Sequence, residues 1–170
     1  MIYIAFIICF LYGLLILYYS KGSDRLKDLV YNQDKPVHFF SILVPFRNEE
    51  LSLPDMLESI AALEYPVDQF ELILINDASS DTSVSIVNSF KKKYPNIHLS
   101  LINNIHQSTS PKKDAIQEGI ARASYDWIIT TDADCVVPKT WLGAFNSMIT
   151  AQGPKMIIAP VTYLSKKGFL

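Results

Sequence analysis

This sequence has few cysteines and no excess of positive charge. The only cysteines are Cys9, inside a long apolar run, and Cys135, at the end of an expected core strand. We expect no disulfide between them, which fits a reducing compartment and excludes a cysteine-ligated zinc site. The 15 Lys and Arg residues face 17 Asp and Glu residues, for a net charge of −2. The composition therefore gives no electrostatic reason to expect nucleic acid as a partner.

Charge is also missing from the stretch Ile2 to Tyr19, which contains one glycine. Its length is close to the ~20 residues that cross a bilayer as a helix, so residues 1–20 are predicted to be a transmembrane anchor. A cleaved signal peptide would have a basic residue before the run and small residues at a cleavage site after it, and this sequence has neither. A buried core helix would show a polar face, and none is visible here. Lys21, Arg25 and Lys27 follow the run, which predicts that everything after residue 20 is cytoplasmic.

Residues 21–36 read as a polar juxtamembrane linker, and residues 37–170 as one domain in which apolar strands alternate with helices. The expected strands are His38–Phe46, Phe70–Asp77, Ile97–Ile102, Tyr125–Asp132 and Lys155–Val161. The expected helices are Asn48–Leu63, one that starts after Ser80 or Asp81, Pro111–Ala123 with Ile116 and Ile120 inward, and Pro138–Thr150. Strands that are apolar throughout indicate an α/β fold with a mostly parallel sheet, right-handed crossovers and helices on both faces.

Polar residues follow three of these strands. Ligands of such sheets bind outside the carboxyl ends of the strands. Those ends carry the segment Pro45–Glu49, the pair Asn76 and Asp77, and the pair Asp132 and Asp134.

Asp132 and Asp134 are two residues apart, and side chains at that spacing on an extended backbone point the same way. Two such carboxylates repel each other unless a cation lies between them, and oxygen ligands suit Mg²⁺ or Mn²⁺. The ion would leave coordination positions for phosphate oxygens, so a nucleotide diphosphate is the expected ligand. The alternative is a strand-end pair that caps the next helix, and only the context of the motif favours the metal.

Four segments in this order resemble the family 2 glycosyltransferases, which have the GT-A nucleotide-sugar fold. They are Ser41–Pro66, Phe70–Ser83, Ser110–Ile128 and Thr131–Cys135. The resemblance implies transfer of a sugar from a nucleotide diphosphate donor, most often a UDP-sugar, with Mn²⁺ or Mg²⁺ as cofactor. The implied partners are the nucleotide sugar, the membrane and an unidentified acceptor, either a glycan or a lipid-linked one.

The resemblance also implies roles for single residues. Asp77 matches the acid that contacts the base of the donor, with a turn or cap residue as the alternative, and Asn76 replaces a more usual Asp. Lys112 matches the lysine near the diphosphate, with a solvated lysine as the alternative. A phosphate there would compensate for a lysine at a helix start, which opposes the helix dipole.

Pro45, Arg47 and Glu49 match the segment that lines the donor site, although Glu49 equally fits a first-turn helix acid. Asp132 and Asp134 match the metal motif, with the second acid as the more direct ligand. The histidines share no motif, so each is expected to have a packing or surface role: His38, His98 and His106.

The acidic catalytic base and the Gln/Arg-x-x-Arg-Trp segment of the family have no match before Leu170. We therefore expect only the donor-binding half here and name no catalytic base. The first hypothesis is a membrane-anchored, cytoplasm-facing glycosyltransferase. A non-catalytic nucleotide-sugar-binding module is the alternative. A sugar-1-phosphate nucleotidyltransferase is a weaker one, because no glycine-rich loop follows the first strand.

Overall fold

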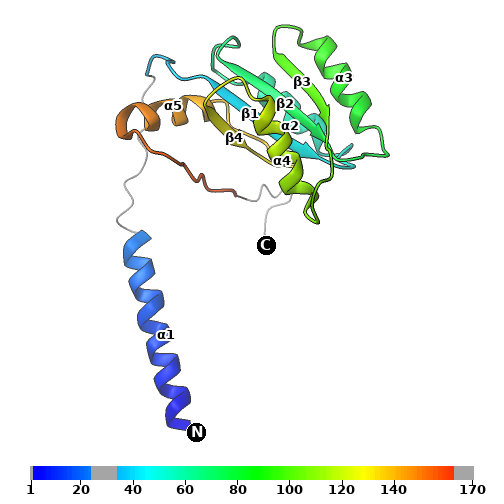
Figure 1. Ribbon diagram of the computed structural model, residues 1–170. Coiled ribbons are helices and arrows are strands. Elements are labelled where there is room, and N and C mark those ends of the chain that lie inside the picture. Colours follow the sequence, from blue (N-terminus) through cyan, green and yellow to red (C-terminus); the bar gives the residue numbers. More distant parts are fainter. Residues whose placement is uncertain (1, 24–33, 163–170) are drawn as a thin grey trace, which may run out of the picture. The chain divides into compact units, whose positions relative to one another are not determined.

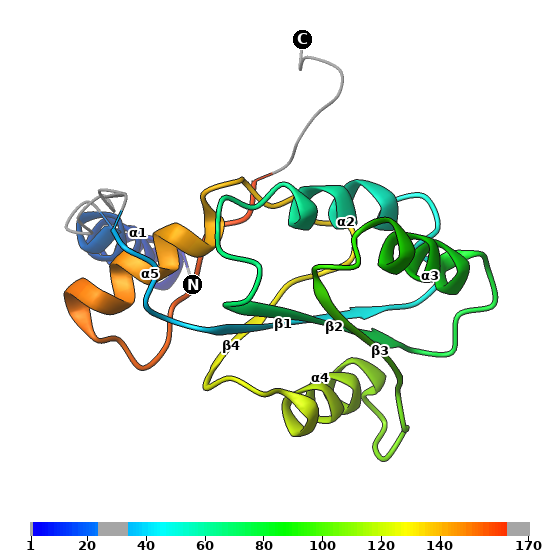
Figure 2. The ribbon, with the colours of Figure 1, turned by 90° about the horizontal axis from the view of Figure 1, so that it is seen from above.

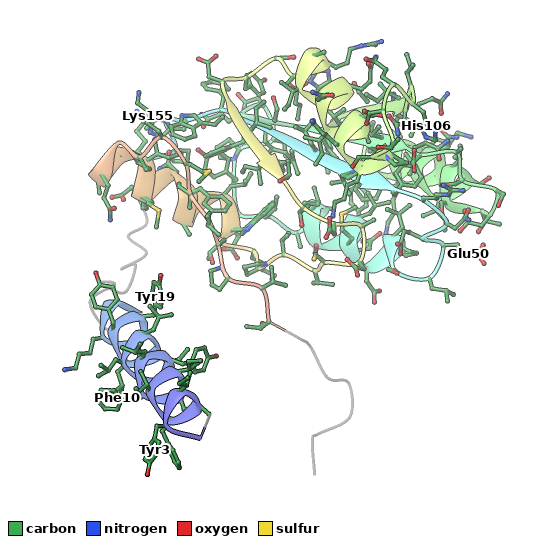
Figure 3. All side chains as sticks on the ribbon, turned by 60° about the horizontal axis from the view of Figure 1, so that its bottom comes forward. Tyr3, Phe10, Tyr19, Glu50, His106 and Lys155 are labelled. Atoms are coloured by element: carbon green, nitrogen blue, oxygen red, sulfur yellow. The ribbon has the colours of Figure 1, made fainter. Side chains whose placement is uncertain are left out.

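The computed structural model describes residues 2–23 and 34–162. The chain divides into two compact units, Met1–Val30 and Tyr31–Leu170, each described here by itself. The first contains helix α1 (Ile2–Ser23), drawn in blue in Figure 1. Large apolar side chains project outward from it, among them Tyr3 and Phe10 (Figure 3), which are 80% and 67% exposed. The stretch Tyr3–Gly22 makes this helix long and apolar enough to cross a membrane, as predicted.

The membrane orientation rested on three basic residues, of which the structure describes one. Lys21 lies in the last turn of α1 and is exposed. Arg25 and Lys27 lie outside the described residues. The cytoplasmic orientation therefore stays a prediction.

The second unit is built on a four-stranded parallel sheet in the order β3-β2-β1-β4 (Figure 1). Its strands are β1 (Phe40–Phe46), β2 (Phe70–Asn76), β3 (His98–Asn103) and β4 (Trp127–Thr130). The two central strands are almost wholly buried, as continuous apolar runs predict. The predicted parallel α/β fold is confirmed.

Helices cover both faces of the sheet (Figure 2). Helices α2 (Leu53–Ala61) and α3 (Ser83–Lys93) lie on one face, and α4 (Pro111–Arg122) lies on the other. Helix α5 (Trp141–Gln152) contributes Leu142 and Ile149 to the larger core, the one under α2 and α3. The smaller core, under α4, is formed by Leu43, Ile73, Ile75 and Ala115.

Helix α4 packs closely against the sheet because of one glycine. A Cβ atom on Gly119 would overlap Cδ2 of Leu43 in β1, so a larger residue would force the buried Leu43 side chain to move. Ala115, one turn earlier, is fully buried on the same face. The expected inward residue Ile120 is instead 50% exposed. The prediction that Ile120 points inward was wrong, because Ala115 and Gly119, four residues apart, face the sheet and Ile120 does not.

Two predicted elements differ in extent. Helix α2 begins at Leu53 and not at Asn48, because Asn48 has a left-handed backbone with φ of 56°. Strand β4 covers only Trp127–Thr130 and is partly exposed, whereas a longer strand buried on both faces was predicted. It pairs with β1 on one side, and in the described part of the chain no strand pairs with its other side. An edge position explains its incomplete burial.

The predicted fifth strand, Lys155–Val161, does not form. The chain runs through this segment without a strand assignment, and Met156 and Ile158 are 74% and 83% exposed. Ile157 alone packs against the larger core. An apolar run predicts contact with a core, but it does not supply the neighbouring strand that a ladder needs.

Candidate functional site

The topology places the site where strand order reverses. From β1 the chain moves outward to β2 and β3, and it then returns to the other side of β1 as β4. In open α/β sheets, ligands bind at the carboxyl ends of the strands near such a switch point. The residues that follow these ends are Arg47 after β1, Asp77 after β2 and Asp132 after β4.

Pro45 lies next to the end of β1, in a strand that is central in the sheet. Proline removes a ladder donor and is normally confined to edges. Here the pairing of β1 with β4 ends at Leu43 and Thr130, so Pro45 lies beyond it. The missing N–H therefore costs β1 no bond to β4.

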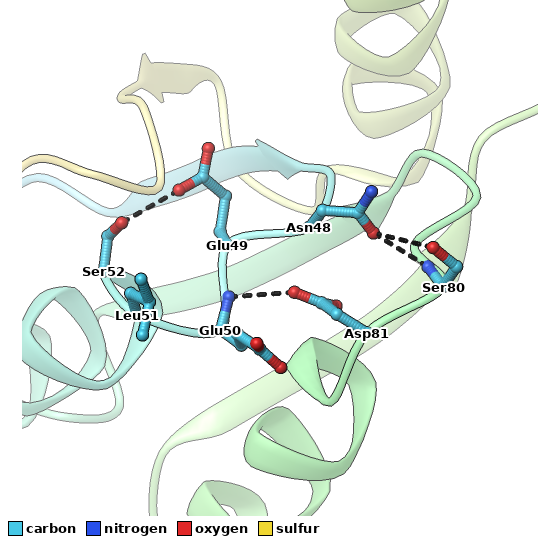
Figure 4. A pocket seen from close by; sticks show the side chains of 7 residues that line it. All are labelled: Asn48, Glu49, Glu50, Leu51, Ser52, Ser80 and Asp81. Carbon is cyan, nitrogen blue, oxygen red and sulfur yellow. Dashed lines mark hydrogen bonds between the residues drawn. The ribbon is translucent and has the colours of Figure 1, made fainter.

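The loops that follow β1 and β2 are joined by side-chain hydrogen bonds (Figure 4). The Asn48 side-chain oxygen accepts a hydrogen bond from Ser80 N at 2.8 Å, and Glu50 N donates to the Asp81 carboxylate at 3.0 Å. Both loops line a cavity of about 370 Å³. These bonds hold the two loops as one unit beside the carboxyl ends of β1 and β2.

Glu49 lies in this cavity. Its carboxylate accepts a hydrogen bond from Ser52 Oγ at 2.9 Å, and its N–H donates to Ser83 Oγ at 2.9 Å. It precedes α2 by a turn, so it is not the first-turn helix acid that the sequence also allowed. Its place in the donor site stays a prediction.

Asp77 is the most enclosed of the predicted site residues, with 12% of its side chain exposed. Its Oδ1 accepts hydrogen bonds from Asn104 Nδ2 and from His106 Nε2, each at 2.5 Å. Arg47 Nη1 lies 3.9 Å from its Oδ2. Burial alone would raise the pKa of Asp77, but the bonds from Asn104 and His106 and the nearby positive charges hold it below its usual value. The structure thus keeps Asp77 ionised.

The sequence did not predict Asn104 or His106 at the site, and the expected packing or surface role of His106 omits its bond to Asp77. Neither belongs to a recognisable motif. Their place in the fold was the available signal, because they follow β3, which pairs with β2 along its whole length to Asn76. Residues that follow two paired parallel strands at the same edge are neighbours.

Asp114 fixes the loop that carries these residues. It lies in the first turn of α4 and is 4% exposed. Its carboxylate accepts hydrogen bonds from Ser108 Oγ at 2.7 Å, Ser108 N at 2.8 Å and Gln107 N at 2.9 Å. The hydrogen bonds from Ser108 lower the pKa of Asp114. Sequence reasoning missed it, although an acid in a first helical turn often binds preceding N–H groups.

Asn76, the residue before Asp77, uses both ends of its side-chain amide. Its Nδ2 donates to Asn103 Oδ1 at 3.1 Å, and its Oδ1 accepts from Ser79 N at 3.0 Å. A carboxylate is an acceptor only and could not donate to Asn103. The amide therefore ties β3 to the loop that carries Asp77.

Lys112 and Asp132 form an ion pair between the start of α4 and the end of β4. Their Nζ and Oδ1 atoms are 2.7 Å apart, and the side chains are 64% and 55% exposed. Lys112 therefore lies next to a predicted metal ligand. Because the side chain is also largely exposed, the role of Lys112 at the diphosphate and the solvated-lysine alternative both stay predictions.

Asp134 follows in a turn. Because β4 ends at Thr130 and Cys135 N donates to Asp132 O at 3.2 Å, the two acids do not lie on one extended strand. The strand-alternation argument for their common direction was therefore wrong. Asp134 lines a larger cavity of about 1770 Å³ that also includes β4 and residues 153–162.

The carboxylates of Asp132 and Asp134 are compatible with an ion such as Mg²⁺, which needs few protein ligands. Among residues 2–23 and 34–162, no three His, Cys, Asp or Glu side chains gather closely enough to hold a metal. In the described part of the chain, Asp132 and Asp134 therefore have no third side chain of these types close enough to complete a metal site. Mg²⁺ is commonly held by one or two carboxylates together with water and substrate phosphates, and this donor set suits such an ion.

Comparisons with known proteins agree with the fold. The sequence model of the family described as "Glycosyl transferase family 2" matches residues 41–169. Poly-beta-1,6-N-acetyl-D-glucosamine synthase of Staphylococcus epidermidis is 37% identical over 118 residues, which are 69% of this chain and 27% of that protein. The chain spans about a quarter of the length of the curated relatives it matches.

Two of the similar solved structures are described here. The mannosyltransferase PcManGT from Pyrobaculum calidifontis, in complex with GDP-Man and Mn²⁺, has a TM-score of 0.70 and 22% identity over 83% of this chain and 41% of its own. Residues 1–349 of S. aureus TarS, in complex with UDP-GlcNAc, give a TM-score of 0.59 and 25% identity over 68% of this chain and 32% of that one. The family match covers most of the sequence and coincides with the GT-A-like sheet and helices, so the chain belongs to glycosyl transferase family 2.

Proposed function

We propose that this chain carries the donor site of a glycosyltransferase, which transfers a sugar from a nucleotide diphosphate sugar to an acceptor with Mn²⁺ or Mg²⁺. The observation that carries the proposal is the arrangement at the carboxyl ends of the strands. There, an enclosed and ionised Asp77 follows β2, and an exposed ion pair joins Lys112, at the start of α4, to Asp132, which follows β4. Both lie inside the segment that matches the family.

Each residue has a role in this proposal. Asp77 accepts a hydrogen bond from the base, and Pro45 and Arg47 line the site beside it. Lys112 leaves Asp132 and binds the diphosphate, for which its exposed ammonium group is free to move. Asp132 and Asp134 hold the divalent ion, which when bound stabilises negative charge on the leaving diphosphate.

The named ligands of similar proteins support a nucleotide-sugar donor. TarS was solved with UDP-GlcNAc and with UDP, and PcManGT was solved with GDP-Man and Mn²⁺. The S. epidermidis relative is named for a polymer of N-acetylglucosamine. We propose a UDP-sugar as the donor, and UDP-GlcNAc is the first to test.

Membrane attachment is the second part of the proposal. Residues 1–20 form the anchor, residues 21–36 the linker and residues 37–170 the donor-binding domain on the cytoplasmic face. The exposed apolar surface of α1 supports the anchor. The acceptor is then a glycan or a lipid-linked molecule within reach of the membrane. Reporters fused at either end of α1 test the orientation, and a periplasmic or extracellular signal after residue 20 would contradict it.

Nucleotide binding tests the function directly. The full chain in detergent is incubated with UDP-GlcNAc and Mn²⁺, and both nucleotide binding and UDP release are measured. We expect binding to depend on Mn²⁺ and to fall in Asp132→Asn, whereas Asp68→Asn, at an exposed acid before β2, serves as the matched control. Release of UDP in addition to binding would favour the enzyme over the non-catalytic binding module. Absence of binding by folded protein would contradict the donor site.

A further inference from the structure

We propose that Asn48 is a positioning residue that holds Arg47 beside Asp77 before any nucleotide binds. The proposal rests on the proposed function, in which Arg47 and Asp77 line the donor site. Asn48 itself does not contact the nucleotide in this proposal, and its effect on binding passes through Arg47.

Backbone pairing between the first two strands stops just before the site. Asp77 N donates to Phe46 O at 2.9 Å, at the end of the ladder in which Phe46 pairs with Asn76. After this bond, side chains join the loop after β1 to the loop after β2 (Figure 4). The position of one loop relative to the other therefore depends on these side chains.

Asn48 makes two of the contacts between the loops. Its side-chain oxygen accepts a hydrogen bond from Ser80 N at 2.8 Å, and its own N–H donates to Ser79 Oγ at 3.1 Å. Asn48 is the residue after Arg47, and the two serines lie in the turn after Asp77. Asn48 thus ties the chain next to Arg47 to the chain next to Asp77.

The backbone conformation marks the same two places. In the described part of the chain, Asn48 and Ala78 are the non-glycine residues with positive φ, each at 56°. A left-handed backbone is uncommon outside glycine, and it persists where the surrounding structure holds it. One of these residues directly follows Arg47 and the other directly follows Asp77. The contacts between the loops therefore support an unusual backbone beside each site residue.

Arg47 depends on this support more than Asp77 does. Asp77 Oδ1 already accepts hydrogen bonds from Asn104 Nδ2 and His106 Nε2. Arg47 Nη1 lies 3.9 Å from Asp77 Oδ2, too far for a hydrogen bond, and its side chain is 58% exposed. An ion pair of this kind fixes a side chain only weakly. The direction of Arg47 is therefore set mainly by its backbone, which Asn48 holds.

Loss of the Asn48 side chain should weaken nucleotide binding while the domain stays folded. Asn48→Gly removes the acceptor and keeps the left-handed backbone, which glycine adopts without strain. Because the loops then have to be ordered on binding, UDP affinity should fall about fivefold, the effect of about one hydrogen bond. Ser80→Ala is the control, since it removes only an Oγ contact of 3.4 Å and keeps the N–H of Ser80. It should bind UDP within about twofold of the wild type.

A double-mutant cycle shows whether Asn48 acts through Arg47. UDP is titrated in Mn²⁺ into the full chain in detergent as wild type, Asn48→Gly, Arg47→Met and the double variant, and thermal unfolding checks that each is folded. Arg47→Met should weaken UDP binding about tenfold, because a charged donor is lost. The double variant should be about as weak as Arg47→Met alone, whereas two independent losses would multiply to about fiftyfold.

Two further variants support the cycle. Asn48→Asp keeps the acceptor oxygen, so in high salt, which screens its charge, it should bind UDP within about twofold of the wild type in the same salt. If Asn48→Gly does not fold, Ser79→Ala, which removes the bond to Asn48 N, takes its place in the cycle.

The outcomes separate the positioning role from the donor site. Losses that multiply in folded variants, or an Arg47→Met variant that binds UDP as tightly as the wild type, would overturn the action of Asn48 through Arg47 and leave the donor site standing. An Asn48→Gly variant that binds as tightly as the wild type would overturn the role of Asn48 itself. Absence of UDP binding by the folded wild type would instead contradict the proposed function on which the role rests.

Discussion

The Lys112–Asp132 ion pair predicts that one substitution shifts two affinities in opposite directions. Lys112 Nζ lies 2.7 Å from Asp132 Oδ1, where a divalent ion would bind under the proposed function. Without nucleotide, the lysine and the metal compete for the same oxygen. With nucleotide, the lysine is expected to bind the diphosphate. Lys112→Met, which keeps the length of the side chain without its charge, should strengthen binding of Mn²⁺ alone and weaken binding of UDP in Mn²⁺.

The exposure of the pair sets the size of the first shift. The side chains are 64% and 55% exposed, so water and salt screen the attraction. Exposed ion pairs contribute about 0.2–1 kcal/mol, which corresponds to about 1.4-fold to about 5-fold in Mn²⁺ affinity. The loss for UDP should be larger, about tenfold, because a charged hydrogen bond to phosphate contributes about 1.5 kcal/mol or more.

The electron paramagnetic resonance signal of free Mn²⁺ measures the first affinity, and calorimetry measures the second. Both are recorded in low salt and again in high salt, where the gain in Mn²⁺ affinity should shrink. Lys113→Met, at the neighbouring exposed lysine, is the matched control. A Lys112→Met variant with Mn²⁺ affinity unchanged in low salt would refute the competition, and one in which both affinities fall would make Lys112 a structural residue.

Three further predictions concern the residues that support the site. Ala78 has a left-handed backbone with φ of 56°, so Ala78→Gly should raise the free energy of unfolding by about 1 kcal/mol, whereas Ala144→Gly inside α5 should lower it by about as much. Thermal unfolding compares the two variants, and destabilisation by both would contradict the strain at Ala78. Glu71 is 3% exposed and accepts hydrogen bonds from Ser41 Oγ and Ser124 N at 2.6 Å each. Glu71→Ala should therefore lower the free energy of unfolding by about 2–4 kcal/mol, and Glu71→Gln should lower it less. Denaturant midpoints test this, and equal losses would show that charge and hydrogen bonding are irrelevant there. The hydrogen bonds from Ser108 lower the pKa of Asp114 from 3.8, so the stabilisation by Asp114 is present above that pH and is lost as the pH falls through the lower pKa of the folded state. Asp114→Asn should therefore flatten the dependence of Tm on pH below about 4. An unchanged slope would count against stabilisation of the loop by Asp114.

Much of the sheet could be predicted from the sequence because its central strands are buried on both faces. The segment His38–Phe46 and the segment Phe70–Asp77 contain continuous apolar runs, and they form β1 and β2 with small shifts at their ends. Lys155–Val161 has the same apolar character and forms no strand. Apolar character reports burial, and a ladder also needs a neighbouring strand, which no local pattern encodes.

The candidate site was predicted in part, according to how each residue is positioned. Asp77 follows β2 and Lys112 lies in the first turn of α4, both in recognisable segments, so sequence reasoning could name them. Asn104 and His106 reach Asp77 only because β3 pairs with β2, a contact between segments far apart in the chain. The direction of Asp134 depends on a turn after a strand that ends early, which the period-two pattern could not foresee.

Binding of UDP by the full chain in detergent, titrated with and without Mn²⁺, tests the central claim most directly. The account predicts binding that requires Mn²⁺ and is lost in Asp134→Ala, and that weakens in Asp77→Ala with or without the ion. A folded Asp134→Ala variant that binds UDP in Mn²⁺ as tightly as the wild type would contradict the assignment of the metal and, with it, the proposed donor site.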